Sequence, residues 1–214
     1  MIEYIKPDEI ENRSFEIIAS ELPHAIDPFF APIIMRAIHT TADFDFADSL
    51  VFSTGAVEGA INALIRGACI VSDTNMIKAG VDKTRLGTFG GDIHCFISDT
   101  DVAQTAKEKG ITRAHVSMDK AVSMDKPFIF AIGNAPTALM RLCDIIEEGN
   151  YLPILVIGAP VGFVNVVEAK ERLMSLNVPH IVARGRKGGS SVVASICNAL
   201  LRMAENALKQ EGNV

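Results

Sequence analysis

A short glycine-rich, basic segment is the strongest candidate for chemistry in this sequence. It reads Gly185-Arg186-Lys187-Gly188-Gly189-Ser190 and lies between a predicted strand and the last predicted helix. Glycines let backbone N–H groups approach a ligand closely, and the amino end of a helix attracts negative charge. Arginine and lysine side chains add charge-assisted hydrogen bonds. The segment therefore predicts an anion site for a phosphate or a carboxylate.

The alternative interpretation of this segment is a flexible glycine turn with solvated charges. The helix that follows favours the anion site, because helix amino ends bind anions in many proteins. The segment lacks the Gly-x4-Gly-Lys-Ser/Thr spacing of a P-loop and the Gly-x-Gly-x-x-Gly spacing of a dinucleotide site. We therefore expect no nicotinamide or flavin cofactor.

One histidine, His39, is the candidate acid–base group. It lies near the end of a predicted helix, three residues after Arg36 on the same helix face. Asp43 follows four residues later and would orient the imidazole if the helix continued that far. Histidine side chains exchange protons near neutral pH, which suits general acid–base chemistry. From the residues alone, a purely structural role for His39 is equally well supported.

Other composition features exclude several classes of protein. The four cysteines lie far apart in apolar runs, and neither Cys-x-x-Cys nor His-x3-His occurs, so we expect no protein-bound metal. The net charge is −6 without a long basic run, which argues against nucleic acid as a partner. The apolar runs are shorter than the ~20 residues of a membrane span. The amino-terminal residues lack the apolar stretch of a secretory signal, so we expect a cytoplasmic protein without a membrane partner.

The elements that must position these residues alternate between strands and helices. Strands are predicted at 68–73, 92–98, 128–133, 152–158 and 180–185, with amphipathic helices between several of them. Further helices are predicted at 7–18, 28–41 and 54–66. This pattern is typical of a doubly wound α/β fold with a mostly parallel sheet of about five strands. We expect one domain over residues 1–214, with a flavodoxin-like strand order and extra N-terminal helices.

Ligands of doubly wound sheets bind beyond the carboxyl ends of the strands. Three such ends carry unusual residues, at 132–137, 157–163 and 184–191. The first contains Asn134, which is either a ligand contact or a residue that hydrogen-bonds its own turn. The last contains the glycine segment, so the anion site is expected at this edge.

Six motifs occur in a characteristic order along the chain. They are Arg13-Ser14-Phe15-Glu16-Ile17-Ile18, Arg36-x-Ile38-His39-Thr40, Asp73-Thr74-Asn75-Met76, Ile132-Gly133-Asn134-Ala135-Pro136-Thr137-Ala138-Leu139, Pro160-Val161-Gly162-Phe163-Val164 and Gly185-Arg186-Lys187-Gly188-Gly189-Ser190. Together they resemble the precorrin-8X methylmutase family, including its cobalt-precorrin-8 branch. The resemblance covers nearly the whole chain.

The resemblance implies an isomerase that moves a methyl group from ring carbon 11 to ring carbon 12 of (cobalt-)precorrin-8. The product is hydrogenobyrinate or cobyrinate, in the biosynthesis of vitamin B12. The resemblance also implies a homodimer with its site near the subunit interface, and no cofactor, since any cobalt belongs to the substrate. In this assignment His39 is catalytic, and the substrate-binding residues are Ser14, Arg36, Arg113, Asn134, Arg186, Gly188, Gly189 and Ser190.

The chemistry of that substrate agrees with the residues. A corrin precursor carries many carboxylates, which explains an anion loop in an acidic protein. The resemblance predicts a 1,5-sigmatropic methyl shift assisted by a proton or hydrogen bond from His39, with catalysis mainly by positioning and electrostatics. Two alternatives remain open: a corrinoid-binding carrier without catalysis, and a flavodoxin-like module that binds phosphate or nucleotides.

Overall fold

The computed structural model describes residues 4–7, 9–124 and 126–211 of the chain. Residue 8, in the first predicted helix, and both ends of the predicted 1–214 domain lie outside the described residues. Six strands form one sheet in the order β1-β6-β5-β4-β2-β3. The strands are β1 (Leu50–Phe52), β2 (Cys69–Ser72), β3 (Ile93–His94), β4 (Phe128–Ile132), β5 (Leu155–Gly158) and β6 (His180–Ala183).

The strand order confirms the flavodoxin-like prediction. The strands β2 to β6 are mutually parallel and lie in the spatial order β3-β2-β4-β5-β6. Numbered from the first of these five, this order is 2-1-3-4-5, which is that of flavodoxin-like sheets. The point where the order reverses lies between β2 and β4. This is where such folds bind their ligands.

Strand β1 adds a sixth, antiparallel strand to the mostly parallel sheet that the sequence predicts. It pairs antiparallel with β6, with Leu50 opposite Ala183 and Phe52 opposite Ile181. Its three residues are too few to show an alternating pattern, and they directly follow a short helix. The sheet is therefore mixed, with one antiparallel strand at an edge.

The remaining elements are eleven helices among the described residues. They are α1 (Ile10–Glu21), α2 (Ala31–Thr41), α3 (Phe46–Ser49), α4 (Ala56–Ile65), α5 (Asn75–Gly80), α6 (Lys83–Thr88), α7 (Thr100–Lys109), α8 (Arg113–Val122), α9 (Pro136–Glu147), α10 (Val166–Ser175) and α11 (Ser190–Glu211). The helices predicted at 7–18, 28–41 and 54–66 correspond to α1, α2 and α4, with shifted ends. None of the helices in the described part of the chain is long and apolar enough to cross a membrane.

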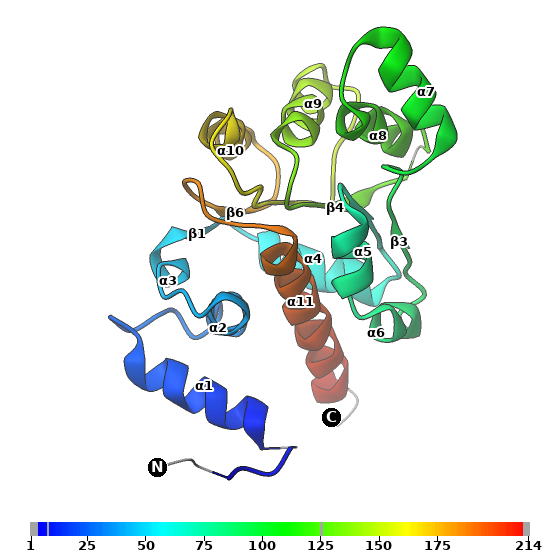
Figure 1. Ribbon diagram of the computed structural model, residues 1–214. Coiled ribbons are helices and arrows are strands. Elements are labelled where there is room, and N and C mark those ends of the chain that lie inside the picture. Colours follow the sequence, from blue (N-terminus) through cyan, green and yellow to red (C-terminus); the bar gives the residue numbers. More distant parts are fainter. Residues whose placement is uncertain (1–3, 8, 125, 212–214) are drawn as a thin grey trace.

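The helices form a layer on each face of the sheet (Figure 1). Helices α8, α9 and α10 cover one face, while α2, α4, α5 and α11 lie on the other. Successive residues of β4 alternate between the two cores: Phe128 and Phe130 pack on the first side, and Ile129 on the second. Both sides of β4 are fully buried, which explains its continuous apolar sequence.

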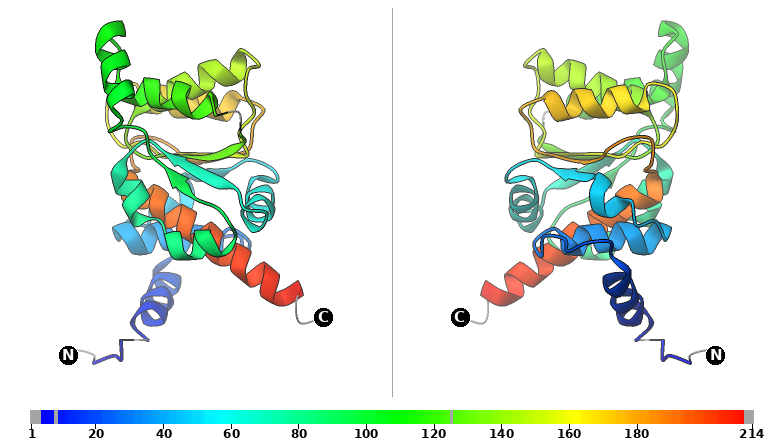
Figure 2. Two further views of the ribbon diagram at one scale, coloured as in Figure 1. Left: turned by 90° about the vertical axis from the view of Figure 1, so that its right-hand side faces the viewer. Right: turned by 90° about the vertical axis from the view of Figure 1, so that its left-hand side faces the viewer.

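The amino-terminal helix lies outside these layers. Helix α1 packs against α2, which in turn packs against α11. Figure 2 shows α1 and the carboxyl-terminal end of α11 projecting away from the sheet. The segment that carries Ser14 is thereby placed against the segment that carries His39, rather than over the sheet.

Candidate active site

Three loops meet at the point where the strand order reverses. The Asp73 carboxylate, at the end of β2, accepts hydrogen bonds from the N–H groups of Gly133, Asn134 and Ala135 at 3.0, 2.9 and 2.7 Å. The hydroxyls of Thr74 and Ser190 lie 3.0 Å apart. The loops after β2, β4 and β6 are therefore joined by direct hydrogen bonds.

Asp73 fixes the shape of the loop that presents Asn134. Its side chain is buried, with 1% of the residue exposed. Burial raises the pKa of the Asp73 carboxyl, while the three N–H donors act in the opposite direction. The Asn134 residue is exposed at the edge of this loop, so its amide is open to a ligand.

The glycine loop between β6 and α11 needs glycine because other backbone lies against it. A Cβ atom on Gly188 would lie 2.2 Å from the carbonyl oxygen of Ala159, and one on Gly133 would lie 3.0 Å from Cα of Ser190. The Gly189 N–H donates to the same Ala159 oxygen at 2.9 Å. These contacts give the loop one defined path.

Arg113 stands beside the Asn134 loop. It is the first residue of α8, and the preceding Thr112 caps this helix by accepting a hydrogen bond from the N–H of His115 at 3.1 Å. The Thr112 hydroxyl also donates to Thr137 at 2.9 Å, in the first turn of α9. Arg113 is exposed there, next to the loop that presents Asn134.

His39 and Ser14 line one pocket between α1 and α2. The pocket has a volume of about 240 Å³ and also contains Ile17 and Phe44. The His39 ring is exposed, and its centroid lies 5.3 Å from that of Phe15. The Ser14 hydroxyl donates to the Ile10 carbonyl within α1 at 2.9 Å. The structure thus brings the predicted acid–base residue and the predicted serine together.

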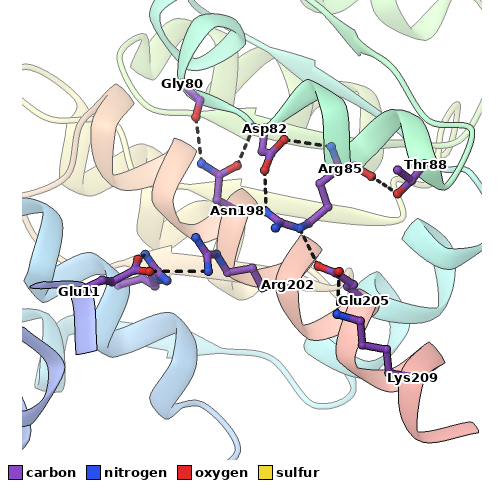
Figure 3. A network of polar contacts seen from close by, with 10 residues as sticks. Glu11, Gly80, Asp82, Arg85, Thr88, Asn198, Arg202, Glu205 and Lys209 are labelled. Atoms are coloured by element: carbon purple, nitrogen blue, oxygen red, sulfur yellow. Dashed lines mark hydrogen bonds and ion pairs between the residues drawn. The ribbon is translucent and has the colours of Figure 1, made fainter. Parts of the chain in front are cut away.

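Arg36 is placed differently. Its guanidinium forms an ion pair with Glu11 and lies 4.8 Å from the Phe15 ring centroid. Glu11 is also 3.8 Å from Arg202 of α11 (Figure 3). The hydrogen bond from Arg36 lowers the pKa of Glu11. Arg36 lines a neighbouring pocket rather than that of His39, and it ties α1 to α2.

Asp43 does not orient the His39 ring from the next helical turn. Helix α2 ends at Thr41, and Ala42 adopts a left-handed conformation with φ of 54°, so the helical spacing is lost. The Asp43 carboxylate instead lies 2.6 Å from Nζ of Lys187, which is also 2.5 Å from Asp45. These contacts lower the pKa of Asp43 and raise that of Lys187. Lys187 therefore links the glycine loop to the segment after His39.

The predicted residues form two neighbouring groups. One lies at the strand ends and consists of Arg113, Asn134, Arg186, Gly188, Gly189 and Ser190. The other consists of His39 and Ser14 on α1 and α2, with Arg36 beside them. No group of three or more metal-ligating side chains is found in the described ranges.

The sequence analysis assigned no individual role to two residues that shape this site, Asp73 and Lys170. Asp73 directly follows a buried strand, and an acidic residue at that position was a usable indication. Lys170 lies in the buried stripe of α10, four residues after Val166, and its ammonium donates to the glycine loop. A lysine within an apolar stripe at helical spacing was the corresponding indication.

The fold and the site define a doubly wound α/β protein in which the loops after β2, β4 and β6 meet at one edge of the sheet. The chain belongs to the precorrin-8X methylmutase family, because the family model described as "Precorrin-8X methylmutase" matches residues 9–203. It is 44% identical to the "Cobalt-precorrin-8 methylmutase" of Priestia megaterium over 210 residues, covering 98% of this chain and 93% of that protein.

Other similar proteins belong to the same family. The "Precorrin-8X methylmutase" of Pseudomonas aeruginosa is 37% identical, covering 94% of this chain and 98% of that protein. A crystal structure of "Precorrin-8x Methyl Mutase" from Thermus thermophilus has a TM-score of 0.86 and 41% identity, covering 94% of this chain and 97% of that one. The residues that match the family model include the N-terminal helices α1 and α2.

Proposed function

We propose that this chain is a methylmutase that moves a methyl group from ring carbon 11 to ring carbon 12 of precorrin-8 or its cobalt form. The product is hydrogenobyrinate or cobyrinate in vitamin B12 biosynthesis. Membership of the methylmutase family supports this reaction. The observation in the structure that carries it is the Lys187–Asp43 ion pair at 2.6 Å, which joins an anion-binding loop to the segment bearing His39.

The strand-end group binds the substrate in this proposal. The helix α11 amino end and the guanidinium of Arg186 suit a carboxylate arm of the ring. Arg186 lies 5.5 Å from the ring centroid of Phe163, which is 82% exposed. A charged and an apolar surface thus lie side by side, as a flat macrocycle with carboxylate arms requires. Arg113 and Asn134 extend the polar part of this edge.

His39 performs the acid–base step in this proposal. Its imidazole donates a proton or a hydrogen bond to the macrocycle, which draws electron density from the ring. The bond from the methyl group to ring carbon 11 breaks as the bond to ring carbon 12 forms, and His39 then recovers any proton it gave. The molecular formula is unchanged, so the reaction needs no oxidant or reductant.

Ser14 of α1 and Arg36 of α2 position the substrate and the His39 pocket in this proposal. Ser14 shares the pocket of His39, where its hydroxyl is available to orient the ring. Arg36 is paired with Glu11, so we propose that it acts by holding α1 against α2 and thereby fixing this pocket. Any direct contact between Arg36 and the substrate would require the guanidinium to leave Glu11.

The direct test is conversion of the substrate by the purified protein. Metal-free and cobalt-containing precorrin-8 are incubated separately with the chain, and the visible spectrum and NMR of the products are recorded. We expect conversion of at least one form without an added cofactor. Binding without conversion would favour the corrinoid carrier, and displacement by nucleotides without corrin binding would favour the phosphate-binding module.

We further propose a homodimer with the site near the subunit interface, located in the cytoplasm and without a nucleic-acid partner. The family resemblance supports the dimer. Light scattering of the purified protein across a concentration series is expected to give twice the monomer mass. A monomer that retains full activity would contradict a site shared between subunits.

A further inference from the structure

One lysine is fully buried directly beneath the glycine loop. Lys170 of α10 has 0% exposure, and its ammonium donates to the carbonyl oxygens of Gly185 and Lys187 at 2.8 Å each. Within the described residues, no carboxylate forms an ion pair with it. Burying an ammonium without an acidic partner is costly, because two carbonyl dipoles replace its hydration only in part. A hydrophobic residue would serve packing alone at lower cost.

Most charged groups on the surrounding elements have other partners, and Glu168 of α10 is exposed to solvent. Glu171 pairs with Arg184 at 3.1 Å, and Lys187 pairs with Asp43 and Asp45. On α9, Asp144 and Glu147 both pair with Arg172 of α10. The remaining cation is Arg186, which is exposed over Phe163. Lys170 is therefore a buried positive charge for which the part of the chain that the structure describes supplies no counter-ion.

The lysine also determines which way the loop peptides face. Three consecutive carbonyls accept hydrogen bonds from the protein: those of Gly185 and Lys187 from Lys170, and that of Arg186 from the Gly162 N–H at 3.2 Å. In a trans peptide the C=O and the following N–H point in opposite directions. The N–H groups of Arg186 and Gly188 consequently point away from Lys170, and that of Lys187 points away from Gly162. Arg186 and Gly188 therefore present two N–H groups on the same side of the loop, and N–H groups arranged in this way bind anions.

We propose that Lys170 is a positioning residue of the anion site, which turns the N–H groups of the glycine loop toward a carboxylate of the substrate and supplies that carboxylate with a buried counter-charge. The inference rests on the proposed function for the identity of the anion. The orientation of the loop is inferred only from the hydrogen bonds of Lys170 to Gly185 and Lys187.

The charge of Lys170 makes anion binding depend on pH. Burial lowers the pKa of Lys170 to about 8, so its ammonium loses a proton just above neutral pH. A bound carboxylate favours the charged form and raises that pKa. By linkage, affinity for the carboxylate is full below pH 8 and falls as the pH rises above it.

The test compares Lys170→Met with Lys209→Met, which removes the same charge from a side chain that is 66% exposed at the end of α11. Affinity for the corrin product hydrogenobyrinate is measured by visible titration from pH 6.5 to 9.5. We expect Lys170→Met to bind about tenfold more weakly at pH 7, as for a lost hydrogen-bonded charge. Its affinity should also lack the decline above pH 8 that wild type and Lys209→Met show. Equal affinity and an equal pH profile would overturn the inference while leaving the proposed function intact.

A second measurement needs no substrate. Hydrogen exchange at the amides of Gly162 and Gly189, which donate to the carbonyls of Arg186 and Ala159, should be at least about tenfold faster in Lys170→Met, and unchanged in β4, if the lysine orients the loop. Lys170→Gln, which keeps a donor without the charge, should restore part of this protection but not the pH profile. Should the wild-type protein fail to bind the product, the counter-charge role and the proposed function both fail, while unchanged exchange would reject the positioning role by itself.

Discussion

The ammonium of Lys187 lies 2.6 Å from a carboxylate oxygen of Asp43, so the glycine loop is bonded directly to the segment that follows His39. The two residues are far apart in sequence and come from the two ends of the fold. Their contact explains how a loop at the end of β6 and a histidine at the end of α2 belong to one site. In the proposed function, the loop holds an anionic arm of the substrate and the histidine exchanges the proton.

Replacing His39 by alanine should abolish most turnover while leaving binding in place. Loss of a positioned general acid or base costs about 10² to 10⁴ in rate. The measurement is kcat for precorrin-8 conversion, with product affinity determined in parallel. His24→Ala is the control, because His24 lies 3.4 Å from Asp48 and does not line the His39 pocket. Wild-type turnover in His39→Ala would exclude His39 as the acid–base residue.

Gly188→Ala should distort the anion loop. The new Cβ atom would lie 2.2 Å from the Ala159 carbonyl oxygen, so the backbone must move. We expect a loss of about 1–3 kcal/mol in the free energy of unfolding, together with weaker product binding. The control is Gly87→Ala in α6, where no heavy atom lies within 4 Å of the added Cβ. Urea unfolding measures the free energy of unfolding of both variants. We expect Gly87→Ala to be as stable as the wild-type protein or more stable.

Reversing the charge of Arg186 should weaken binding of the carboxylated ring. Hydrogen bonds between charged groups contribute about 1.5–3 kcal/mol, which corresponds to a loss of roughly tenfold or more in affinity for Arg186→Glu. The loss should shrink at high salt because exposed charges are screened. Arg66→Glu makes the same change at the opposite edge of the sheet and should leave affinity almost unaltered. Similar affinities for the two variants would remove Arg186 from the site.

The stability of the protein without ligand should increase with pH because of Lys170. The pKa of this lysine is about 8 when folded, against 10.5 for an unperturbed lysine. Between these values the unfolded chain binds more protons than the folded one, so the free energy of unfolding rises with pH, by up to about 3 kcal/mol. Urea unfolding of wild type and Lys170→Met from pH 7 to 10.5 measures the difference. Parallel pH profiles would mean that Lys170 keeps an ordinary pKa in the fold.

The sequence predicted the parallel part of the fold because most of its strands are continuous apolar runs followed by a turn residue. β4 is the clearest case, since it is buried on both faces. Strand β1 was missed because three residues carry no period, and its pairing with β6 is a tertiary contact. The strand at 92–98 was predicted too long, as only Ile93 and His94 pair with β2.

The candidate site was predictable where glycine and charge occur together at a strand end. The partners of those residues were not predictable, since they come from distant elements. Arg36 has the sequence spacing of a residue beside His39, yet Glu11 of another helix pairs with it. Lys170 was hidden within an apolar stripe, and only its hydrogen bonds to Gly185 and Lys187 show what it does.

The antiparallel pairing of β1 with β6 has a mechanical consequence. The chain runs from His39 through α3 into β1, and β6 runs directly into the glycine loop. Register between the strands is fixed by Leu50 opposite Ala183, and the Arg184 N–H donates to the Ser49 carbonyl at 2.7 Å. The separation between the segment that bears His39 and the glycine loop is thus set by main-chain hydrogen bonds, which side-chain substitutions leave in place. Substitutions near His39 or in the glycine loop can therefore change the side chains of the site while the distance between these two segments stays constant.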